Sequence, residues 1–527
     1  MGTATIGTSE SMAGGSDWSE GYVTEIGYIH GYCRELDPGA MRLACLSAGV
    51  AYQESEELRY LELGYGQGLS INIHATAIDG DFWGTDFNPA QTAHARRLAQ
   101  ASGSGVRLLN DSFKELAHRP DLPEFDIIAL HGIWSWISDA NRRAIVEIVR
   151  KRLRVGGLLY VSYNCLPGWA GAMSVRHLMT LHAQHGSPDL AGPTAKIDAA
   201  VSFAQQLADC GARYFKANPF ALNRLQEIGR QNRNYLAHEY FNRDWRLMNF
   251  SDVSKSLESA KLSFAASAAL LEHVDTLHLP LEGQKLVAQI RHPVLKESVR
   301  DYFVNQQFRR DIFVKGLRCL TPLERQEAWL KERFVLVKHQ KDIPRTVPGG
   351  QGDATLHEEV YSPLIEVLAE DSYAPKTVEY LVRHPRLESL QFPQISESLL
   401  VLVGAGHLQR AQSPSQASRA RCRALNAHLC HRSRIDGDIG FLASPVTGGG
   451  VPVSRADQLF ILAMQQGTEQ SIALADFARG LMAKNGIEMF TEGKRIDSSE
   501  GRMTALAGLA EQFATRSLPI LRALEVI

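Results

Sequence analysis

Residues 59–163 alternate between short apolar runs and segments in which apolar residues recur every three to four positions. The short runs predict buried strands, and the second pattern predicts amphipathic helices. The predicted strands are 59–63, 81–85, 105–110, 125–131 and 157–163, and the predicted helices between them are 70–77, 89–101 and 139–153. Strands that alternate with helices are typical of a parallel sheet with helices on both faces, so we predict a doubly wound α/β domain.

Two helix starts carry an N-cap residue followed by proline. Asp37-Pro38 begins a predicted lead-in helix that runs to about Ala51, and Asn88-Pro89 begins the helix 89–101. Asp and Asn side chains accept hydrogen bonds from the first helical N–H groups, and proline fits the first turn because no donor is needed there. Both pairs therefore mark where these helices begin.

Helical periodicity dominates after Pro167-Gly168, and we expect no strand of comparable strength for well over a hundred residues. Segment 343–353, with two prolines and three glycines, predicts a linker or an exposed loop. The predicted helices before this segment are 197–208, 219–231, 253–260 and 292–303. Those after it are 358–369, 376–383 and 395–405, which match a small winged-helix-like unit in size, followed by 455–465, 472–484 and 503–513.

We therefore divide the chain into five parts, with a mainly helical middle region and a mostly α-helical C-terminal domain. They are a flexible start with the helical lead-in (1–55), the α/β domain (56–170), a helical segment (171–235), a helical middle domain (236–343) and a C-terminal domain (354–527). A chain of 527 residues is long enough for roughly three or four domains, which agrees with this division.

The overall composition narrows the classes of function. The 56 Lys and Arg residues balance the 58 Asp and Glu residues, so no global charge holds the chain on nucleic acid, which is disfavoured as a partner. Seven scattered cysteines without a CxxC pair indicate reduced thiols and a cytoplasmic protein. The start has no apolar signal segment, and no later stretch reaches about 18 apolar residues, so we expect neither secretion nor a membrane span.

A glycine-rich run, Leu61-Glu-Leu-Gly-Tyr-Gly-Gln-Gly68, follows the first predicted strand and opens a helix. Its glycines allow a tight turn and close approach of a ligand to the helix N-terminus. A dinucleotide fingerprint requires glycine where this chain has Leu69, so NAD and FAD are disfavoured. Glu62 would repel a pyrophosphate but suits the cationic amino-acid end of S-adenosylmethionine. The cofactor contacts expected here are Glu62, Gly64, Tyr65, Gly66 and Gly68.

Acidic residues also follow the second and third predicted strands. Asp86 can accept both hydroxyls of a ribose with Phe87 against the adenine, and Asp111 can accept a hydrogen bond from the adenine amino group. Taken singly, each acid also fits a surface residue, a helix cap or a turn former. Because the carboxyl ends of parallel strands share one sheet edge, the acids together predict one cofactor site. The contacts expected here are Asp86, Phe87, Asn88, Asp111, Ser112 and Phe113.

Through residues 61–68, 84–88, 110–113 and 153–163 the chain resembles the class I S-adenosylmethionine-dependent methyltransferases. The resemblance covers about residues 20–170. It implies a Rossmann-like catalytic domain, S-adenosylmethionine as the cofactor and S-adenosylhomocysteine as the product.

Three further segments are similar to bacterial methyltransferases that carry a methyltransferase regulatory domain. They are Tyr22–Tyr28, Tyr163–Trp169 and His238–Tyr240. The layout is also similar to that of rickettsial outer-membrane-protein lysine methyltransferases. This narrower resemblance implies a helical dimerisation segment, and therefore a homodimer through residues 171–235, and it adds Tyr22 to the expected cofactor contacts.

Methyl transfer from a sulfonium is an in-line displacement, so catalysis rests mainly on placing the acceptor lone pair. For a lysine acceptor, an aromatic wall would hold the methylene stem and attract the ammonium, and Asn164 could orient the amine. For a hydroxyl acceptor a base is needed, and His131 is the candidate. The candidate catalytic residues, which follow the fourth and fifth predicted strands or lie in the lead-in, are Tyr28, His131, Trp134, Trp136, Tyr163 and Asn164, and His131 is also an expected cofactor contact.

Each of these residues also has a purely structural interpretation. His131 equally fits a packing histidine bonded to the backbone, and the tryptophans fit a core. Trp134 and Trp136 would share one side of an extended segment but separate on a helical turn. Cys165 has no partner at informative spacing and fits a buried, inert thiol.

Two C-terminal features suggest other chemistry. Cys422, His428, Cys430 and His431 lack the paired spacing of structural zinc sites, so we predict no metal. The stretch 408–434 holds six arginines and no acid. We interpret it as a solvated, partly mobile loop, with binding of an acidic protein or nucleic acid as the alternative.

The sequence thus predicts an S-adenosylmethionine-dependent methyltransferase. Its expected acceptor is a protein side chain, lysine first, because more than 300 residues beyond the catalytic sheet suit a macromolecular acceptor. One alternative is an enzyme that methylates a small metabolite or sugar, with the extra domains as a lid or dimer interface. The other is a non-catalytic module that binds the cofactor as a sensor or scaffold.

Overall fold

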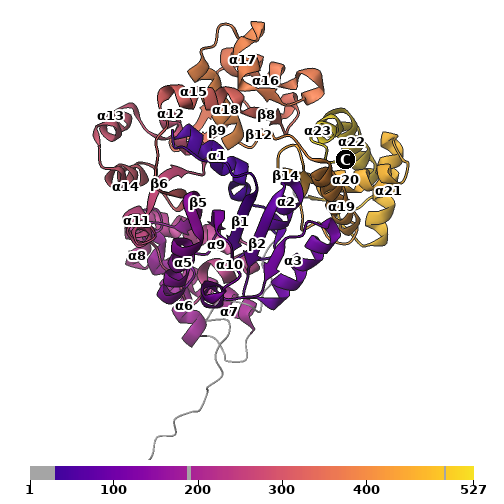
Figure 1. The fold of residues 1–527 in the computed structure, drawn as a ribbon. Coiled ribbons are helices and arrows are strands. Elements are labelled where there is room, and N and C mark those ends of the chain that lie inside the picture. The colour runs from indigo at the N-terminus through magenta and orange to yellow at the C-terminus, as the bar shows by residue number, and fades with distance from the viewer. Residues whose placement is uncertain (1–29, 187–191, 492–493) are drawn as a thin grey trace, which may run out of the picture.

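The computed structural model describes residues 30–186, 192–491 and 494–527. At the centre of this described part is a seven-stranded sheet with the order β3-β2-β1-β4-β5-β7-β6 (Figure 1). Strands β1 to β5 run parallel, and β7 is antiparallel to both β5 and β6. The strands are β1 (Leu58–Leu63), β2 (Gly80–Thr85), β3 (Arg107–Leu109), β4 (Phe125–Leu130), β5 (Leu153–Asn164), β6 (Leu262–Ser267) and β7 (Phe308–Lys315). The predicted α/β fold is confirmed.

Helices cover both faces of this sheet and create two cores. Successive strand residues point to opposite faces, so Tyr60 and Ile127 pack in one core while Leu61 and Ile128 pack in the other. The first core contains α1 (Pro38–Ser47), α2 (Leu69–Ala77) and α3 (Pro89–Ser102), and the second contains α4 (Phe113–His118), α5 (Asp139–Arg152) and α11 (Phe250–Glu258).

The predicted helix caps are present. The Asp37 carboxylate accepts a hydrogen bond from the Gly39 N–H at 2.6 Å, and the Asn88 side chain accepts one from the Ala90 N–H at 2.9 Å. Ser112 additionally forms a capping box with Glu115 at the start of α4. These caps fix α3 and α4 directly after the carboxyl ends of β2 and β3.

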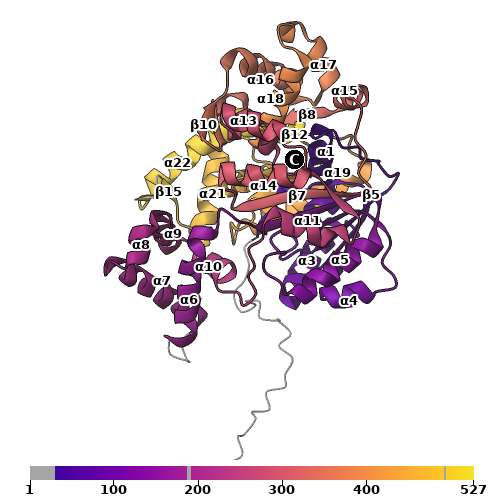
Figure 2. The same cartoon turned by 90° about the vertical axis from the view of Figure 1, so that its left-hand side faces the viewer.

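The middle region is mainly helical, as predicted, but it also supplies β6 and β7. The expectation of no strand for well over a hundred residues after Pro167 is therefore wrong. Strand β7 reads as polar because it contains Arg309 and Asp311, which are buried together with Arg309 Nε 2.9 Å from Asp311 Oδ2. Figure 2 shows α6 to α9 as a cluster beside the sheet domain. The helices of this region are α6 (Met173–His185), α7 (Pro193–Asp209), α8 (Arg213–Ala217), α9 (Pro219–Arg230), α10 (Arg233–Tyr240), α12 (Asp275–His278), α13 (Leu281–Gln289) and α14 (Pro293–Val304).

Segment 343–353 is not the predicted linker but largely a hairpin of β9 (Thr346–Gly349) and β10 (Gly352–Thr355). Its glycines permit close packing, because a Cβ added to Gly349 would lie 2.4 Å from the Leu277 carbonyl oxygen. A Cβ added to Gly350 would lie 2.9 Å from the His278 carbonyl oxygen. The glycines that suggested flexibility therefore allow a tight contact.

The three short helices predicted after this segment are confirmed. They pack with a small antiparallel sheet of order β11-β8-β12. The elements of this unit are α15 (Pro322–Lys331), β8 (Arg333–Leu336), α16 (Glu358–Tyr373), β11 (Lys376–Thr377), α17 (Val378–Arg383), α18 (Phe392–Gly404) and β12 (Leu408–Arg410). The rest of the C-terminal domain contains α19 (Gln416–Arg432), β13 (Phe441–Ser444), β14 (Gly449–Pro452), α20 (Arg455–Gln465), α21 (Ser471–Lys484), β15 (Phe490–Thr491), β16 (Lys494–Arg495), α22 (Ser499–Gln512) and α23 (Leu518–Ala523).

The interpretation of residues 408–434 as a solvated loop is wrong, because most of the stretch forms helix α19. One face of α19 buries Cys422, Leu425 and Leu429. The helix packs against α2 and α3 of the sheet domain (Figure 1). The arginines made the stretch look solvent-exposed in the sequence. Some of them instead form hydrogen bonds across the contact between α19 and the sheet domain.

Two further observations concern the described part of the chain. Within residues 30–186, 192–491 and 494–527, no helix combines the length and the apolar character needed to cross a bilayer. Over the same ranges, no cluster of three or more His, Cys, Asp or Glu side chains is arranged to hold a metal ion. Cys422 and Cys430 are buried free thiols on α19.

Candidate cofactor site

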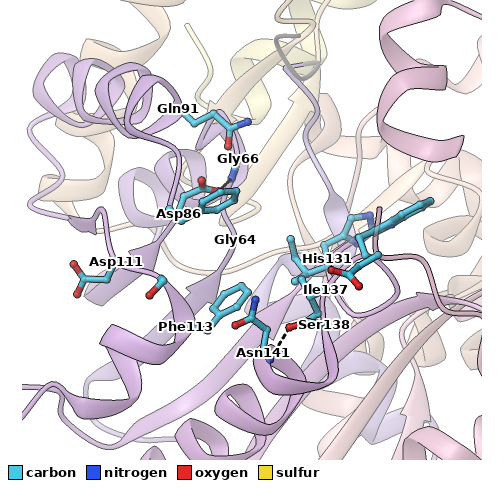
Figure 3. A pocket seen from close by; sticks show the side chains of 16 residues that line it. Gly64, Gly66, Asp86, Gln91, Asp111, Phe113, His131, Ile137, Ser138 and Asn141 are labelled. Atoms are coloured by element: carbon cyan, nitrogen blue, oxygen red, sulfur yellow. Dashed lines mark hydrogen bonds between the residues drawn. The ribbon is translucent and has the colours of Figure 1, made fainter. Parts of the chain in front are cut away.

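A pocket lies at the carboxyl edge of the sheet, where β1 to β4 end (Figure 3). Its walls come from the glycine-rich run, the starts of α3, α4 and α5, and the segment after β4. The residues that line it are Gly64, Gly66, Asp86, Phe87, Gln91, Asp111, Ser112, Phe113, His131, Gly132, Ile133, Trp136, Ile137, Ser138, Asn141 and Asp244.

The glycine-rich run adopts backbone conformations that favour glycine. Gly64, Gly66 and Gly68 have φ values of +75°, +57° and +74°. The run also packs tightly, because a Cβ added to Gly68 would lie 2.4 Å from the Ala95 Cβ on α3. Gly64 and Gly66 line the pocket, whereas Gly68 supports the run from behind. The backbone can therefore approach a ligand closely, as the spacing predicted.

Asp86 lies at the pocket wall directly after β2. Its carboxylate accepts hydrogen bonds from the N–H groups of Gly66 and Asn88, both at 2.9 Å. The Gln91 amide faces this carboxylate, and with its nitrogen assigned to that side the nitrogen lies 3.1 and 3.2 Å from the two oxygens. Burial raises the pKa of Asp86 to about 6, so it is largely ionised at neutral pH. A carboxylate held in this way can accept both hydroxyls of a ribose.

Glu62 is buried near the same edge. It is 3% exposed and accepts a hydrogen bond from the Tyr60 hydroxyl at 3.2 Å. Burial raises the pKa of Glu62 to about 8, and the nearby Asp86 carboxylate contributes to the shift. Glu62 is not among the pocket-lining residues, but it stands near the end of β1, two positions before Gly64 of the pocket wall.

The third acidic position is already paired. Asp111 lines the pocket, and its carboxylate accepts a hydrogen bond from Arg119 Nη1 at 2.8 Å. Ser112 and Phe113, also predicted, line the pocket beside it, and Ser112 caps α4. Arg119 is eight residues away and gave no sequence signal. The ion pair that competes with the adenine amino group for Asp111 was therefore not predicted.

His131 lines the pocket after β4, as predicted. Its Nδ1 lies 2.8 Å from the Tyr160 hydroxyl, and the two rings stack with centroids 5.9 Å apart. Burial lowers the pKa of His131 to about 4, so the imidazole is neutral at pH 7. The Phe308 ring, at the start of β7, packs edge-on against His131 at 5.8 Å. The structure thus adds Phe308, a residue of the middle region, to the surroundings of His131.

The candidate aromatic wall is only partly assembled at the pocket. Trp136 lines it, whereas Trp134 is fully buried in the second core and donates a hydrogen bond from its indole N–H to the Met248 sulfur at 3.2 Å. A turn closed by the Trp136 N–H and the Ile133 carbonyl separates the two rings. Of the alternatives left open, the helical-turn geometry is the one observed.

Tyr163 and Asn164 lie at the end of β5 but do not line the pocket. The Tyr163 hydroxyl donates to Asp311 Oδ2 at 2.6 Å inside the second core, so the structure gives Tyr163 no place in an aromatic wall. Asn164 is buried, and its Nδ2 has no hydrogen-bond partner among the described residues. Tyr22 and Tyr28 lie outside the described residues.

Two other predicted contacts have supporting positions. The Tyr65 hydroxyl bonds Thr92 and the Leu109 carbonyl oxygen, each at 2.8 Å, which ties the glycine-rich run to α3 and β3. Asn88 caps α3 without lining the pocket. Residues that sequence reasoning missed include Gln91, Ile133, Ile137, Ser138, Asn141 and Asp244.

A charged pair lies beyond His131 and Phe308. The Arg310 guanidinium lies over the Phe308 ring, 5.1 Å from its centroid. Arg310 Nε lies 3.5 Å from Glu35 Oε1, in the 3₁₀ turn Arg34–Leu36. Segments near residues 35, 131 and 310 therefore meet beside His131.

Comparisons with known proteins agree with this geometry. Residues 61–157 match the model of a methyltransferase domain, and residues 232–315 match that of a predicted methyltransferase regulatory domain. The chain is 35% identical over 514 residues to the uncharacterized protein sll1526 of Synechocystis sp.. The aligned region covers 97% of this chain and 99% of that protein. It is 24% identical over 276 residues to the uncharacterized protein RP789 of Rickettsia prowazekii, which covers 50% of this chain and 46% of that protein.

Among solved structures, PKMT2 from Rickettsia typhi in complex with AdoHcy has a similar fold. It superimposes with a TM-score of 0.67 at 16% identity and covers 95% of this chain and 99% of that chain. The likeness therefore extends beyond the sheet to the middle and C-terminal regions. Because both family models match within one chain that aligns with the Synechocystis protein along nearly its whole length, this protein belongs to the class I S-adenosylmethionine-dependent methyltransferases that carry a methyltransferase regulatory domain.

Proposed function

We propose that this methyltransferase acts on a protein side chain, with lysine as the first candidate. The observation that carries the proposal is the neutral His131 at the acceptor corner, whose pKa burial lowers to about 4. A histidine with so low a pKa is a weak base at pH 7 and gives little help to a hydroxyl acceptor. An amine needs no enzyme base once it has lost its proton, so the corner suits an amine better than a hydroxyl.

The residues present fit the cofactor. We assign the ribose hydroxyls to the ionised Asp86, the amino-acid end to Glu62 and the space over Gly64 and Gly66, and the adenine to the apolar wall that includes Phe113. Bound cofactor supplies an electrophilic methyl group on a sulfonium. The chain's own contribution is to orient the reactants and exclude water, which accounts for most of the catalysis that such a displacement needs.

Asn164 is the proposed orienting residue for the acceptor. Its side chain lies on the same face of β5 as Tyr160 and Ser162, since these residues alternate along the strand. Tyr160 contacts His131, and the Ser162 hydroxyl accepts a hydrogen bond from the Gly132 N–H at 2.8 Å. The amide oxygen of Asn164 can accept a hydrogen bond from the N–H of an incoming amine and leave the amine lone pair for the methyl group. Glu35, beside Arg310, adds a carboxylate near the same corner.

Two further features support a protein acceptor. PKMT2, the solved chain of similar fold, bears the abbreviation of a protein lysine methyltransferase. The middle and C-terminal domains also give a larger surface than a metabolite requires. We further propose a cytoplasmic location, and self-association through the helical cluster α6 to α9, which exposes the apolar side chains Met173, Leu181, Phe203, Leu207 and Phe220.

Incubation of the purified protein with methyl-labelled cofactor and a lysate of its own host tests the acceptor. We expect acid-precipitable label, and mass spectrometry of the labelled proteins should place it on lysine. Asp86→Ala is the matched control and should give little label. Label confined to low-mass material would exclude a protein acceptor, and binding without any transfer would favour the sensor alternative.

A further inference from the structure

Helix α19 of the C-terminal domain bonds to both helices that flank the glycine-rich run. Arg421 Nη2 lies 2.7 Å from Asp79 Oδ1, and Arg421 Nε donates to the Thr76 carbonyl at 3.1 Å. Gln412, shortly before α19, donates to the Ala77 carbonyl at 2.9 Å. These bonds satisfy carbonyl groups at the C-terminal end of α2, whose N-terminus is the glycine-rich run.

Arg432, the last residue of α19, reaches the run itself through a histidine. Arg432 Nη1 lies 2.6 Å from His94 Nε2, and His94 Nδ1 lies 2.8 Å from the Gln67 carbonyl oxygen. Burial lowers the pKa of His94 to about 4, so the ring is neutral and carries one N–H. Because arginine can only donate, Nε2 must accept, and the Nδ1–H donates to Gln67.

Gln67 occupies the most adaptable part of the cofactor site. It lies between Gly66 and Gly68, both with positive φ, and glycines have many accessible conformations. On the pocket side, Asp86 holds the Gly66 N–H. On the opposite side, His94 holds the Gln67 carbonyl, while Gly68 rests against Ala95, the neighbour of His94 on α3. The run is thus fixed from both sides.

We propose that Arg432 is a positioning residue for the cofactor-binding run and acts through His94. The contact of α19, in the C-terminal domain, with α3 then determines the affinity for the cofactor. This inference rests on cofactor binding at the glycine-rich run. Coupling between two sites is reciprocal, so cofactor binding also strengthens the seating of α19, and a partner that displaces α19 lowers cofactor affinity.

Arg421 provides the matched control. Like Arg432, it crosses from α19 to the sheet domain, but it forms an ion pair with Asp79, bonds the far end of α2 and does not contact the run. A contact that only holds the two domains together would make Arg421→Ala and Arg432→Ala equivalent. A positioning contact makes Arg432→Ala weaken the cofactor complex selectively.

The test is calorimetric titration of the full-length protein with S-adenosylhomocysteine. We expect Arg432→Ala to weaken binding by about 5- to 50-fold and Arg421→Ala by less than about twofold, with melting temperatures similar to each other. Arg432→Lys, which keeps a donor, should recover part of the loss. In His94→Asn, the shorter amide can still donate to Gln67 but does not extend to Arg432 as the ring Nε2 does, so adding Arg432→Ala should cost nothing more.

Amide hydrogen exchange of residues 64–68 gives a readout that does not depend on binding. Exchange should quicken in Arg432→Ala and stay at the wild-type rate in Arg421→Ala. Equal affinity losses in the two alanine variants, or unchanged exchange and affinity in Arg432→Ala, would overturn the inference. If Arg432→Ala does not fold, the cofactor affinity and the amide exchange of His94→Asn alone provide the test. A wild-type protein that fails to bind would instead refute the assigned cofactor site.

Discussion

Glu62→Gln should abolish a proton release that accompanies cofactor binding. In the free protein the Glu62 carboxyl is 3% exposed, and burial raises its pKa to about 8. At pH 7 roughly nine-tenths of the molecules therefore carry a proton on this group. The ammonium group at the amino-acid end of the cofactor, placed beside Glu62, favours the ionised carboxylate. Binding therefore expels that proton.

The size of the effect follows from the pKa values. An opposite charge within ~4–6 Å lowers a carboxyl pKa by about 1–3 units, which would bring Glu62 from about 8 to between about 5 and 7. The release at pH 7 is then roughly 0.4 to 0.9 proton per cofactor bound. Asp86 adds little, because a pKa of about 6 leaves it mostly ionised before binding.

Calorimetric titration with S-adenosylhomocysteine in two buffers of different ionisation enthalpy measures this release directly. The wild type should show a buffer-dependent enthalpy at pH 7, and Glu62→Gln should show almost none while binding more weakly. Asp86→Asn serves as the control, because burial, the largest cause of the raised Glu62 pKa, persists in it and most of the release should remain. An equal release in Glu62→Gln and the wild type would refute the assignment of Glu62 to the cofactor's amino-acid end.

The same raised pKa fixes the sign of a stability effect in the free protein. The folded-state pKa of Glu62 lies above its ordinary value of 4.5, so the associated stabilisation is fully present below pH 4.5 and is lost as pH rises through about 8. Glu62→Gln cannot ionise and should lose less stability across that window. Urea unfolding at pH 5 and pH 8.5 measures the difference, and parallel losses in both proteins would contradict a buried, protonated Glu62.

Three other substitutions test the remaining assignments. Asp86→Ala should weaken S-adenosylhomocysteine binding by roughly 10- to 150-fold in calorimetry, because a hydrogen bond to a charged acceptor contributes about 1.5–3 kcal/mol, and unchanged affinity would remove the ribose assignment. Asn164→Ala should lower kcat about fivefold through the loss of about 1 kcal/mol of orientation, with cofactor affinity unchanged, whereas an equal loss of affinity would place Asn164 at the cofactor instead. His131→Asn should lower kcat by less than about tenfold for an amine acceptor, and a loss of about 10²- to 10⁴-fold in steady-state assays would identify His131 as a general base.

The parts of the fold that sequence analysis predicted are those with local signals. Strands β1 to β5 are short, mainly apolar runs, and α1 and α3 begin at cap residues followed by proline. Strand β7 has no such signal, because Arg309 and Asp311 look like surface residues until their pairing is known. Arg309 also contacts Glu297 on α14 at 2.9 Å, so the partners that permit its burial come from another element.

The same distinction applies to the site. Glu62 and Asp86 could be placed because each follows a predicted strand, and parallel strands end at one edge. The pairing of Asp111 with Arg119 and the presence of Asp244 at the pocket depend on how loops fold back, which no periodicity reveals. Trp134 and Trp136 differ in role because of one turn, whose geometry two-residue spacing alone leaves open.

The electrostatics of the site connect cofactor binding with the C-terminal domain. Glu62 and Asp86 are buried carboxyls whose pKa values are raised, so burial disfavours the charged form of each. Contacts outside the site help to keep it in shape, because the desolvation of two carboxyl groups opposes its closure. Arg432 and His94 supply such a contact without adding a formal charge to the pocket, since the neutral imidazole separates the guanidinium from the glycine-rich run. A direct arginine contact at Gln67 would bring a cation closer to the glycine-rich run, on which the cofactor's own positive charge must bind. The intervening histidine avoids that repulsion while it transmits the position of α19.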